Sequence, residues 1–94
     1  MGKASRRRPK RLGEKLRHIR EGLGLSQNGI IQQLGLADVI SRDNVSAYEL
    51  GRREPSLLVL LEYARAAGVC LDLLVDDKAD LPKRLPRVPK HKCK

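Results

Sequence analysis

Apolar side chains recur every three or four positions along much of the chain, which is the spacing of one face of an α-helix. The first stretch with this pattern is LGEKLRHIREGLGLS, in which polar residues fill the positions between the apolar ones. The apolar positions in helical register are Leu12, Leu16, Ile19 and Leu23. Glycines near the end of the stretch indicate where the helix stops. We therefore predict a first helix that begins at Leu12.

Two shorter helices are predicted next, and each is followed by a glycine that fits a C-terminal stop. Ser26 is a good N-cap for the stretch QNGIIQQL. The inward positions of this second helix are Ile30, Ile31 and Leu34. Ser41 caps a third helix, which runs from about Arg42 to Leu50. The segment between the two helices, LADVI, is either a loop with apolar anchors or an extra helical turn.

Two further helices complete the pattern. Pro55 and Ser56 suit the start of a fourth helix, LLVLLEYARAA, which is apolar over much of its circumference. A helix of that kind is usually surrounded by others, so we predict that it is the central one. A short fifth helix, LDLLV, follows it. The chain is therefore predicted to be all-α, with a five-helix domain at residues 12–77.

Basic residues are concentrated at the two ends of the chain. Residues 1–11 and residues 78–94 each carry a net charge of +6, whereas residues 12–77 carry −3, which returns the total of +9. The first segment lacks helical periodicity and the last is rich in proline and lysine, so we expect two disordered basic arms. Basic arms of this kind usually contact a polyanion, although solubilising tails or a localisation signal are alternatives.

The sequence offers no feature of a membrane protein, a secreted protein or an enzyme. It has no run of about 18 apolar residues that would predict a membrane span. No apolar stretch follows the basic N-terminus, so no secretory signal is predicted. Cys70 and Cys93 are too few for a disulfide framework, and we expect free thiols in a reducing cytoplasm. His18 and His91 lack metal-ligand spacing, so we expect no metal, no cofactor and no enzymatic activity.

The predicted second and third helices, joined by a short connection, make a helix-turn-helix candidate. Four motifs resemble the Cro and phage-repressor (Xre-type) DNA-binding family, whose domains have the five-helix lambda-repressor-like fold. The motifs are LRHIREGLGLSQ, QLG, VSAYELGRREPS and LLEYARAAGVCLDLL, at residues 16–27, 33–35, 45–56 and 60–74. They occur in the family's order and near its spacing. The resemblance implies a sequence-specific, double-stranded DNA-binding transcriptional regulator of the repressor type.

The resemblance also implies roles for individual residues, beginning with a third helix that reads the major groove. That groove is about 12 Å wide and admits an α-helix. The implied base contacts are Arg42, Asp43, Asn44, Ser46 and Ala47. The implied phosphate contacts are Gln27, Arg52 and Arg53. Because phosphate contacts depend mainly on positive charge, we add Arg6, Arg7 and Arg8 of the N-terminal arm.

Some of these assignments have alternatives. Asp43 either accepts a hydrogen bond from cytosine or stabilises the start of the third helix through the helix dipole. Ser46 and Ala47 either contact bases or form an inert helix surface. The resemblance further implies an ion pair between Arg20 and Glu49 that fixes the third helix on the first, with two independent surface charges as the alternative.

The chain departs from the family pattern between the second and third helices, where the connection is longer by about four residues. Four residues can add a helical turn or widen the loop, and either change can shift the base-contact register by a position.

The resemblance implies partners as well as DNA. The family commonly dimerises on palindromic sites, so a homodimer is expected. Four apolar residues can lie either at its interface or in the core: Leu71, Leu73, Leu74 and Val75. An antitoxin or adaptor that binds a protein partner with the same fold is the main alternative function, and a general nucleic-acid binder that acts through its arms is another. We expect a cytoplasmic, nucleoid-associated protein without membrane contact.

Overall fold

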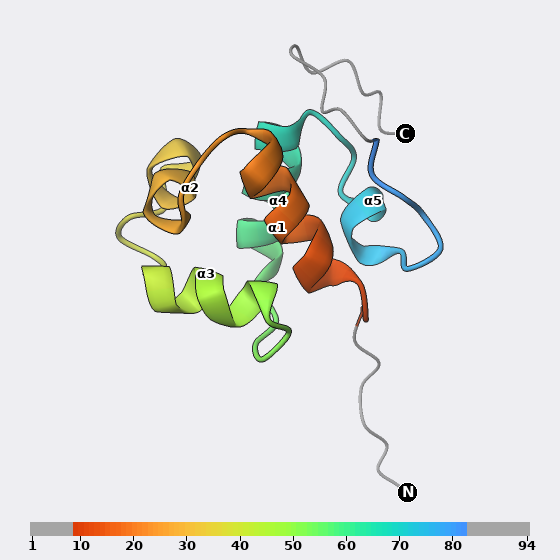
Figure 1. Ribbon diagram of the computed structural model, residues 1–94, viewed down its shortest axis with the longest axis horizontal. Coiled ribbons are helices and arrows are strands. Elements are labelled where there is room, and N and C mark those ends of the chain that lie inside the picture. The colour runs from red at the N-terminus through yellow and green to blue at the C-terminus, as the bar shows by residue number, and fades with distance from the viewer. Residues whose placement is uncertain (1–8, 83–94) are drawn as a thin grey trace, which may run out of the picture.

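The computed structural model describes residues 9–82, which form five α-helices (Figure 1). They are α1 (Leu12–Gly22), α2 (Gln27–Leu34), α3 (Arg42–Glu49), α4 (Leu57–Ala67) and α5 (Asp72–Val75). No strand occurs between residues 9 and 82, so the prediction of an all-α, five-helix fold is confirmed there. The expected disorder of the arms concerns residues 1–8 and 83–94, which lie outside the described residues.

Serine caps begin three of the helices, as the sequence predicts. The Oγ atoms of Ser26, Ser41 and Ser56 each accept a hydrogen bond from the backbone amide three residues later. A cap of this kind satisfies one of the amides that the first turn of a helix leaves unpaired, and it typically contributes about 1 kcal/mol. The caps fix where α2, α3 and α4 begin and therefore set the register of the helix-turn-helix.

The core is built from aliphatic side chains and two tyrosines, to which α4 contributes along most of its length. The buried residues of α4 are Val59, Leu60, Tyr63, Ala64 and Ala67. They pack in one cluster with buried residues of the other four helices. The helix is not buried all round, however, because Leu57 and Leu58 in its first turn are 69% and 73% exposed. The start of α4 therefore presents an apolar surface to solvent.

The longer connection between α2 and α3 folds as a single turn. The backbone amides of Val39 and Ile40 both donate to the carbonyl oxygen of Leu36, at 2.9 and 3.0 Å. Ile40 is buried in the core, whereas Val39 is exposed. The segment is thus a turn with one main apolar anchor, and the additional residues are accommodated before α3 begins at its Ser41 cap.

Two further expectations from the sequence concern the cysteines and membrane spans. Cys70 is disulfide-bonded, so the expectation of a free thiol is wrong for this residue, and Cys93 lies outside the described residues. Between residues 9 and 82, every helix is too short or too polar to span a bilayer.

Candidate nucleic-acid interface

α3 lies along an outer edge of the molecule and packs on α1 and α2 (Figure 1). Only Val45 and Tyr48 of its residues are buried. Of the positions predicted to contact bases, Arg42 and Asp43 are exposed. The others, Asn44, Ser46 and Ala47, are half-buried. A helix that buries so little of its surface leaves one face free for another molecule.

The side chain of Asn44 has a structural role that sequence analysis missed. Its Oδ1 accepts hydrogen bonds from the backbone amide and the hydroxyl of Ser41, at 2.9 and 3.1 Å. The Ser41 hydroxyl oxygen accepts in turn from the Asn44 backbone amide at 3.3 Å, which completes a reciprocal capping box. The sequence signal is a serine three residues before an asparagine, where glutamate or glutamine is the usual partner. The Asn44 side chain is therefore already engaged at the start of α3.

α3 ends in a turn that presents two arginines. Gly51 has a φ of +74°, a left-handed conformation that suits glycine, and its amide donates to the carbonyl oxygen of Tyr48 at 3.1 Å. The amide of Arg52 donates to the carbonyl oxygen of Ala47 at 2.9 Å, which closes a Schellman motif. Arg52 and Arg53 are exposed directly beyond this motif. Two guanidinium groups therefore follow the C-terminal end of α3, where positive charge also complements the helix dipole.

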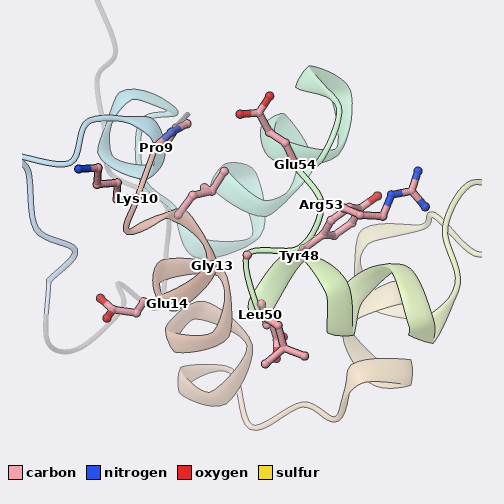
Figure 2. A pocket seen from close by; sticks show the side chains of 11 residues that line it. Pro9, Lys10, Gly13, Glu14, Tyr48, Leu50, Arg53 and Glu54 are labelled. Carbon is pink, nitrogen blue, oxygen red and sulfur yellow. The ribbon is translucent and has the colours of Figure 1, made fainter. Parts of the chain in front are cut away.

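α1 approaches the end of α3 most closely at Gly13. A Cβ atom there would lie 2.7 Å from the carbonyl oxygen of Glu49 and 2.8 Å from that of Tyr48. Both contacts are with backbone atoms, which cannot move aside as a flexible side chain can. Figure 2 shows Gly13 beside the turn that carries Leu50, with the Arg53 side chain extending away from α1. Glycine at position 13 thus allows α1 to support the last turn of α3, a role that sequence analysis also missed.

A buried ion pair joins Arg20 of α1 to Glu49 of α3. Arg20 Nε and Nη2 donate to the two carboxylate oxygens of Glu49, at 2.7 and 3.1 Å. The two side chains are only 14% and 5% exposed. The hydrogen bond with Glu49 raises the pKa of Arg20. The structure therefore brings together the two residues that the family resemblance pairs, at the end of α3 farthest from its cap.

Two neighbours extend this ion pair into a larger polar cluster. Arg20 Nη1 donates to the carbonyl oxygen of Leu25 at 3.0 Å, and Gln27 Nε2 donates to Glu49 Oε1 at 3.3 Å. Leu25 lies between α1 and α2, and Gln27 is the first residue of α2. The cluster thus joins α1, α2 and α3, and it holds the side chain of the half-buried Gln27 in place.

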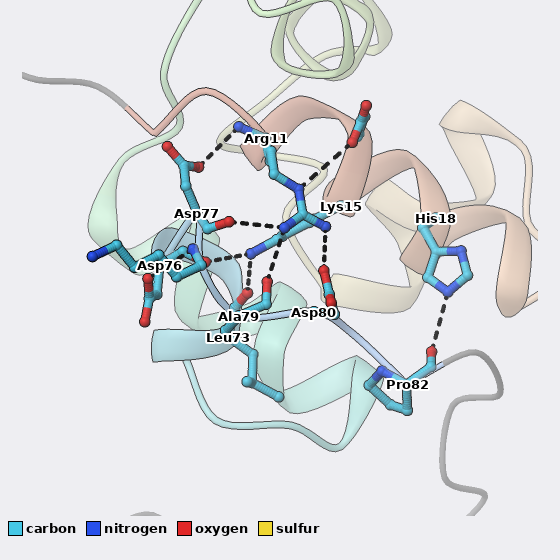
Figure 3. Close-up of polar contacts among 11 residues, drawn as sticks. Arg11, Lys15, His18, Leu73, Asp76, Asp77, Ala79, Asp80 and Pro82 are labelled. Carbon is cyan, nitrogen blue, oxygen red and sulfur yellow. Dashed lines mark hydrogen bonds and ion pairs between the residues drawn. The ribbon is translucent and has the colours of Figure 1, made fainter.

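A second polar cluster ties the start of α1 to residues 76–82 (Figure 3). The Asp77 carboxylate accepts hydrogen bonds from the backbone amides of Lys10 and Arg11, at 2.9 and 3.0 Å. These bonds lower the pKa of Asp77. Arg11 Nη1 donates to the carbonyl oxygen of Asp77 at 2.8 Å, and its Nη2 pairs with Asp80 at 2.6 Å. Arg11, at the N-cap position of α1, supplies no side-chain cap. Asp77 caps α1 instead, from a distant part of the chain.

Lys15 provides the reciprocal contact between α1 and α5. Its Nζ donates to the carbonyl oxygens of Leu73 and Asp76, at 2.6 and 2.7 Å (Figure 3). The residue is only 3% exposed, and burial lowers its pKa. Carbonyl groups at the end of a helix lack partners within the helix, and a lysine can supply them. Lys15 and Asp77 therefore cap α5 and α1 respectively, although no sequence signal connects residues so far apart.

The arrangement of α2 and α3 around a turn, with one face of α3 free, defines a helix-turn-helix domain. The chain belongs to the helix-turn-helix domain family, whose sequence profile matches residues 11–76. This membership agrees with the resemblance to Cro and phage-repressor domains, and it indicates a DNA-binding regulator in a family that is typically non-enzymatic. Neither the curated proteins nor the solved structures gave a match.

The remaining predicted sites are only partly covered by the described residues. No group of histidine, cysteine, aspartate and glutamate in residues 9–82 has the arrangement of a metal site. His18 Nε2 lies 3.3 Å from the carbonyl oxygen of Pro82, at the described end of the C-terminal arm. Residues Arg6, Arg7, Arg8 and His91 lie outside the described residues.

Proposed function

We propose that this protein is a sequence-specific, double-stranded DNA-binding transcriptional regulator that inserts α3 into the major groove and acts as a repressor. The observation that carries the proposal is the support of α3 on one side only, which leaves Arg42 and Asp43 at its exposed start. Repression requires only that an operator be occupied, which DNA binding by itself accomplishes. A protein with this function is cytoplasmic and associated with the nucleoid.

Base reading is assigned to the first turns of α3. Arg42 is the main reader, because a guanidinium can donate to both N7 and O6 of guanine. Ala47 is small enough to meet a thymine methyl group, and Ser46 can accept or donate beside it. Asp43 either accepts from cytosine or acts through the helix dipole. The side chains of these residues differ enough in chemistry to distinguish one base pair from another.

Asn44 is a base reader of a different kind, because its side chain is part of the capping box. A bidentate contact with adenine needs both its Oδ1 and its Nδ2. The Oδ1 accepts two hydrogen bonds from Ser41 in the free protein. An adenine contact would therefore cost part of a cap worth about 1 kcal/mol.

Phosphate contacts are assigned to groups around the C-terminal end of α3. Gln27 donates one N–H of its amide to Glu49, which leaves the second N–H for a phosphate oxygen. Arg52 and Arg53 supply positive charge directly beyond the same end of α3. Pro9, the first described residue, lines the same surface pocket as Arg53 (Figure 2). Arg6, Arg7 and Arg8 are assigned to phosphate contacts on their charge alone.

A homodimer on a palindromic operator is the second part of the proposal. Leu57 and Leu58 are largely exposed, and Leu57 lines one surface pocket with the exposed Val75. We call Leu57, Leu58 and Val75 the apolar patch. Leu74, in contrast, is fully buried and belongs to the core. A two-fold dimer would bury the same patch on both copies and present two copies of α3 to half-sites about one helical turn apart.

The apolar patch is also where a protein partner would bind if the chain were an antitoxin or an adaptor. Sedimentation of the purified full chain distinguishes the two uses. The proposal expects a concentration-dependent dimer that Leu57→Asp converts to a monomer. Val39→Asp changes a similarly exposed residue between α2 and α3, outside the patch, and should leave the dimer intact. A chain that stays monomeric both free and on DNA would exclude the homodimer and favour a protein partner.

The test of the main function is selection of the full chain on random duplex DNA. We expect one enriched motif, and binding that weakens steeply with salt at a log–log slope near −0.9 for each neutralised phosphate. A variant with Arg6, Arg7 and Arg8 changed to glutamine should select the same motif with lower affinity. If every duplex is bound alike, the proposal fails and a general nucleic-acid binder that acts through its arms becomes the better account.

A further inference from the structure

The turn between α2 and α3 carries an apolar side chain that the core does not use. Val39 is 64% exposed, whereas Ile40, its neighbour in the chain, is buried in the core. Two hydrogen bonds fix the backbone of the turn, because the amides of both residues donate to the carbonyl oxygen of Leu36, at 2.9 and 3.0 Å. A defined turn therefore holds the side chain of Val39 at the surface.

Val39 lies immediately before the helix that is proposed to read bases. Exposure alternates at this junction, since Val39 and the N-cap residue Ser41 are exposed on either side of the buried Ile40. In Figure 1 the connection runs along the outer edge of the molecule and leads directly into the start of α3. Three residues span at most about 11 Å, so the Cα atom of Val39 lies within that distance of Arg42.

The chemistry of this turn suits contact with bases better than contact with phosphates. Asp38 is the only charged residue between Leu34 and Arg42, and it is exposed beside Val39. Phosphates are bound by lysine, arginine and hydrogen-bond donors, and a carboxylate repels their negative charge. In the major groove, the apolar group of a base pair is the C5-methyl group of thymine. A branched apolar side chain such as valine is complementary to that methyl group.

We propose that the turn at residues 36–40 is a second reading element, in which Val39 contacts the C5-methyl group of a thymine near the bases that α3 reads. The inference rests on the proposed function, because it requires α3 to lie in the major groove. Adjacent bases along one strand are about 3.4 Å apart. A separation of at most about 11 Å therefore places the thymine within about three base-pair steps of the pair that Arg42 reads.

Uracil scanning of the selected DNA motif tests this contact, because uracil differs from thymine only in lacking the C5-methyl group. Each thymine is replaced singly, and the affinity of the full chain is measured on every duplex. At the thymine that Val39 contacts, wild type should lose about twofold to fivefold in affinity, the effect of burying one methyl group. Val39→Ala should bind the thymine and uracil duplexes nearly equally, at about the affinity of wild type for the uracil duplex.

Two matched variants separate this contact from other effects. Val39→Ile keeps a branched apolar side chain and should keep the preference for thymine. Leu50→Ala truncates an apolar side chain of similar exposure, 61%, at the other end of α3, and should leave the ratio of thymine to uracil affinity unchanged. Because Val39 is largely exposed, Val39→Ala should also leave the midpoint of urea denaturation close to that of wild type, so a lower affinity would not reflect unfolding.

The variant also distinguishes Val39 from Ala47, to which the proposed function assigns another thymine methyl group. A methyl effect due to Ala47 would persist in Val39→Ala, whereas one due to Val39 would disappear. The pair that Arg42 reads is the one whose preference Arg42→Ala relaxes. A Val39-dependent thymine that lies well beyond about three base-pair steps from this pair would overturn the inference.

The same measurements distinguish failure of this inference from failure of the proposed function. If wild type prefers no duplex, the proposed function fails and the second reading element fails with it. If wild type selects a motif whose methyl effects are all unchanged in Val39→Ala, the turn is not a reading element, and only this inference is overturned.

Discussion

Gly13 and Glu49 meet with no room for a side chain between them, since a Cβ on Gly13 would lie 2.7 Å from the Glu49 carbonyl oxygen. The side chain of Glu49 is held by the same helix, through Arg20. Both the backbone and the carboxylate of one residue thus rest on α1. A change on this face of α1 should therefore displace the last turn of α3 first.

We expect Gly13→Ala to lower the free energy of unfolding by about 1–3 kcal/mol, because the new methyl group overpacks a rigid backbone contact. Urea denaturation measures the change. Gly29→Ala is the matched control, since its Cβ would meet first the side-chain oxygen of Ser26, at 3.1 Å. Alanine also favours the helix there by about 1 kcal/mol. Equal destabilisation by the two substitutions would mean that the contact at Gly13 is not special.

Arg20→Met should be far more damaging than Arg17→Met in the same helix. Arg20 pairs with the 5% exposed Glu49, so its removal leaves a buried charge and should cost about 3–5 kcal/mol. Arg17 pairs with Glu21 at 2.9 Å, but the side chains are 61% and 54% exposed, so its loss should cost at most about 1 kcal/mol. Thermal or urea denaturation of both variants compares the pairs directly, and similar losses would contradict the assignment of a structural ion pair.

Arg42→Ala and Arg53→Ala should have different kinds of effect on DNA binding. Arg42→Ala should relax preference at one base pair, because a bidentate contact with a base is worth about 1–3 kcal/mol of discrimination. Arg53→Ala should lower affinity about equally on all sequences and reduce the salt slope by about one phosphate. Titrations of wild type and both variants on matched and mismatched duplexes separate these effects. The reverse pattern would show that the base-contact register is displaced.

Stability should fall in acid as Asp77 becomes protonated. The amides of Lys10 and Arg11 lower the pKa of Asp77 below its ordinary value of 3.8 in the folded protein, so the unfolded chain binds this proton more readily. The contribution is therefore complete well above pH 3.8 and is lost as the pH falls through the folded value. Urea denaturation from neutral pH into this range measures the loss. Asp77→Asn keeps an acceptor oxygen and should show a shallower pH dependence than wild type.

Much of the fold could be predicted from local signals, because α2, α3 and α4 each carry a start and a stop signal in the sequence. Serine at an N-cap and glycine behind the last turn are short-range features, and apolar spacing identifies the buried face. The same reasoning did not decide between a loop and a helical turn for LADVI. The conformation of this segment depends on which of its apolar side chains pack on the core, and these are Leu36 and Ile40. It also treated the start of α4 as enclosed, because periodicity does not show that no neighbouring element covers Leu57 and Leu58.

The candidate site was predicted less completely, for a physical reason. Exposure of Arg42 and Arg53 follows from an amphipathic helix and its terminating glycine, which the sequence displays. The contacts of Gly13 and Lys15 join helices that are distant in sequence, and a glycine or a lysine in an amphipathic stretch gives no sign of its partner. The pairing of Arg20 with Glu49 was expected only from the family resemblance, since neither residue has a local signal.

The reciprocal capping of α1 and α5 bears on how the chain can be shortened for crystallisation or spectroscopy. A fragment cut at the predicted limits, 12–77, would discard Arg11 and the amide of Lys10, and with them the groups that Asp77 binds. The better fragment begins no later than Pro9 and ends no earlier than Pro82. Any loss of DNA affinity in a shorter piece would mix two causes, missing charge and a loosened scaffold.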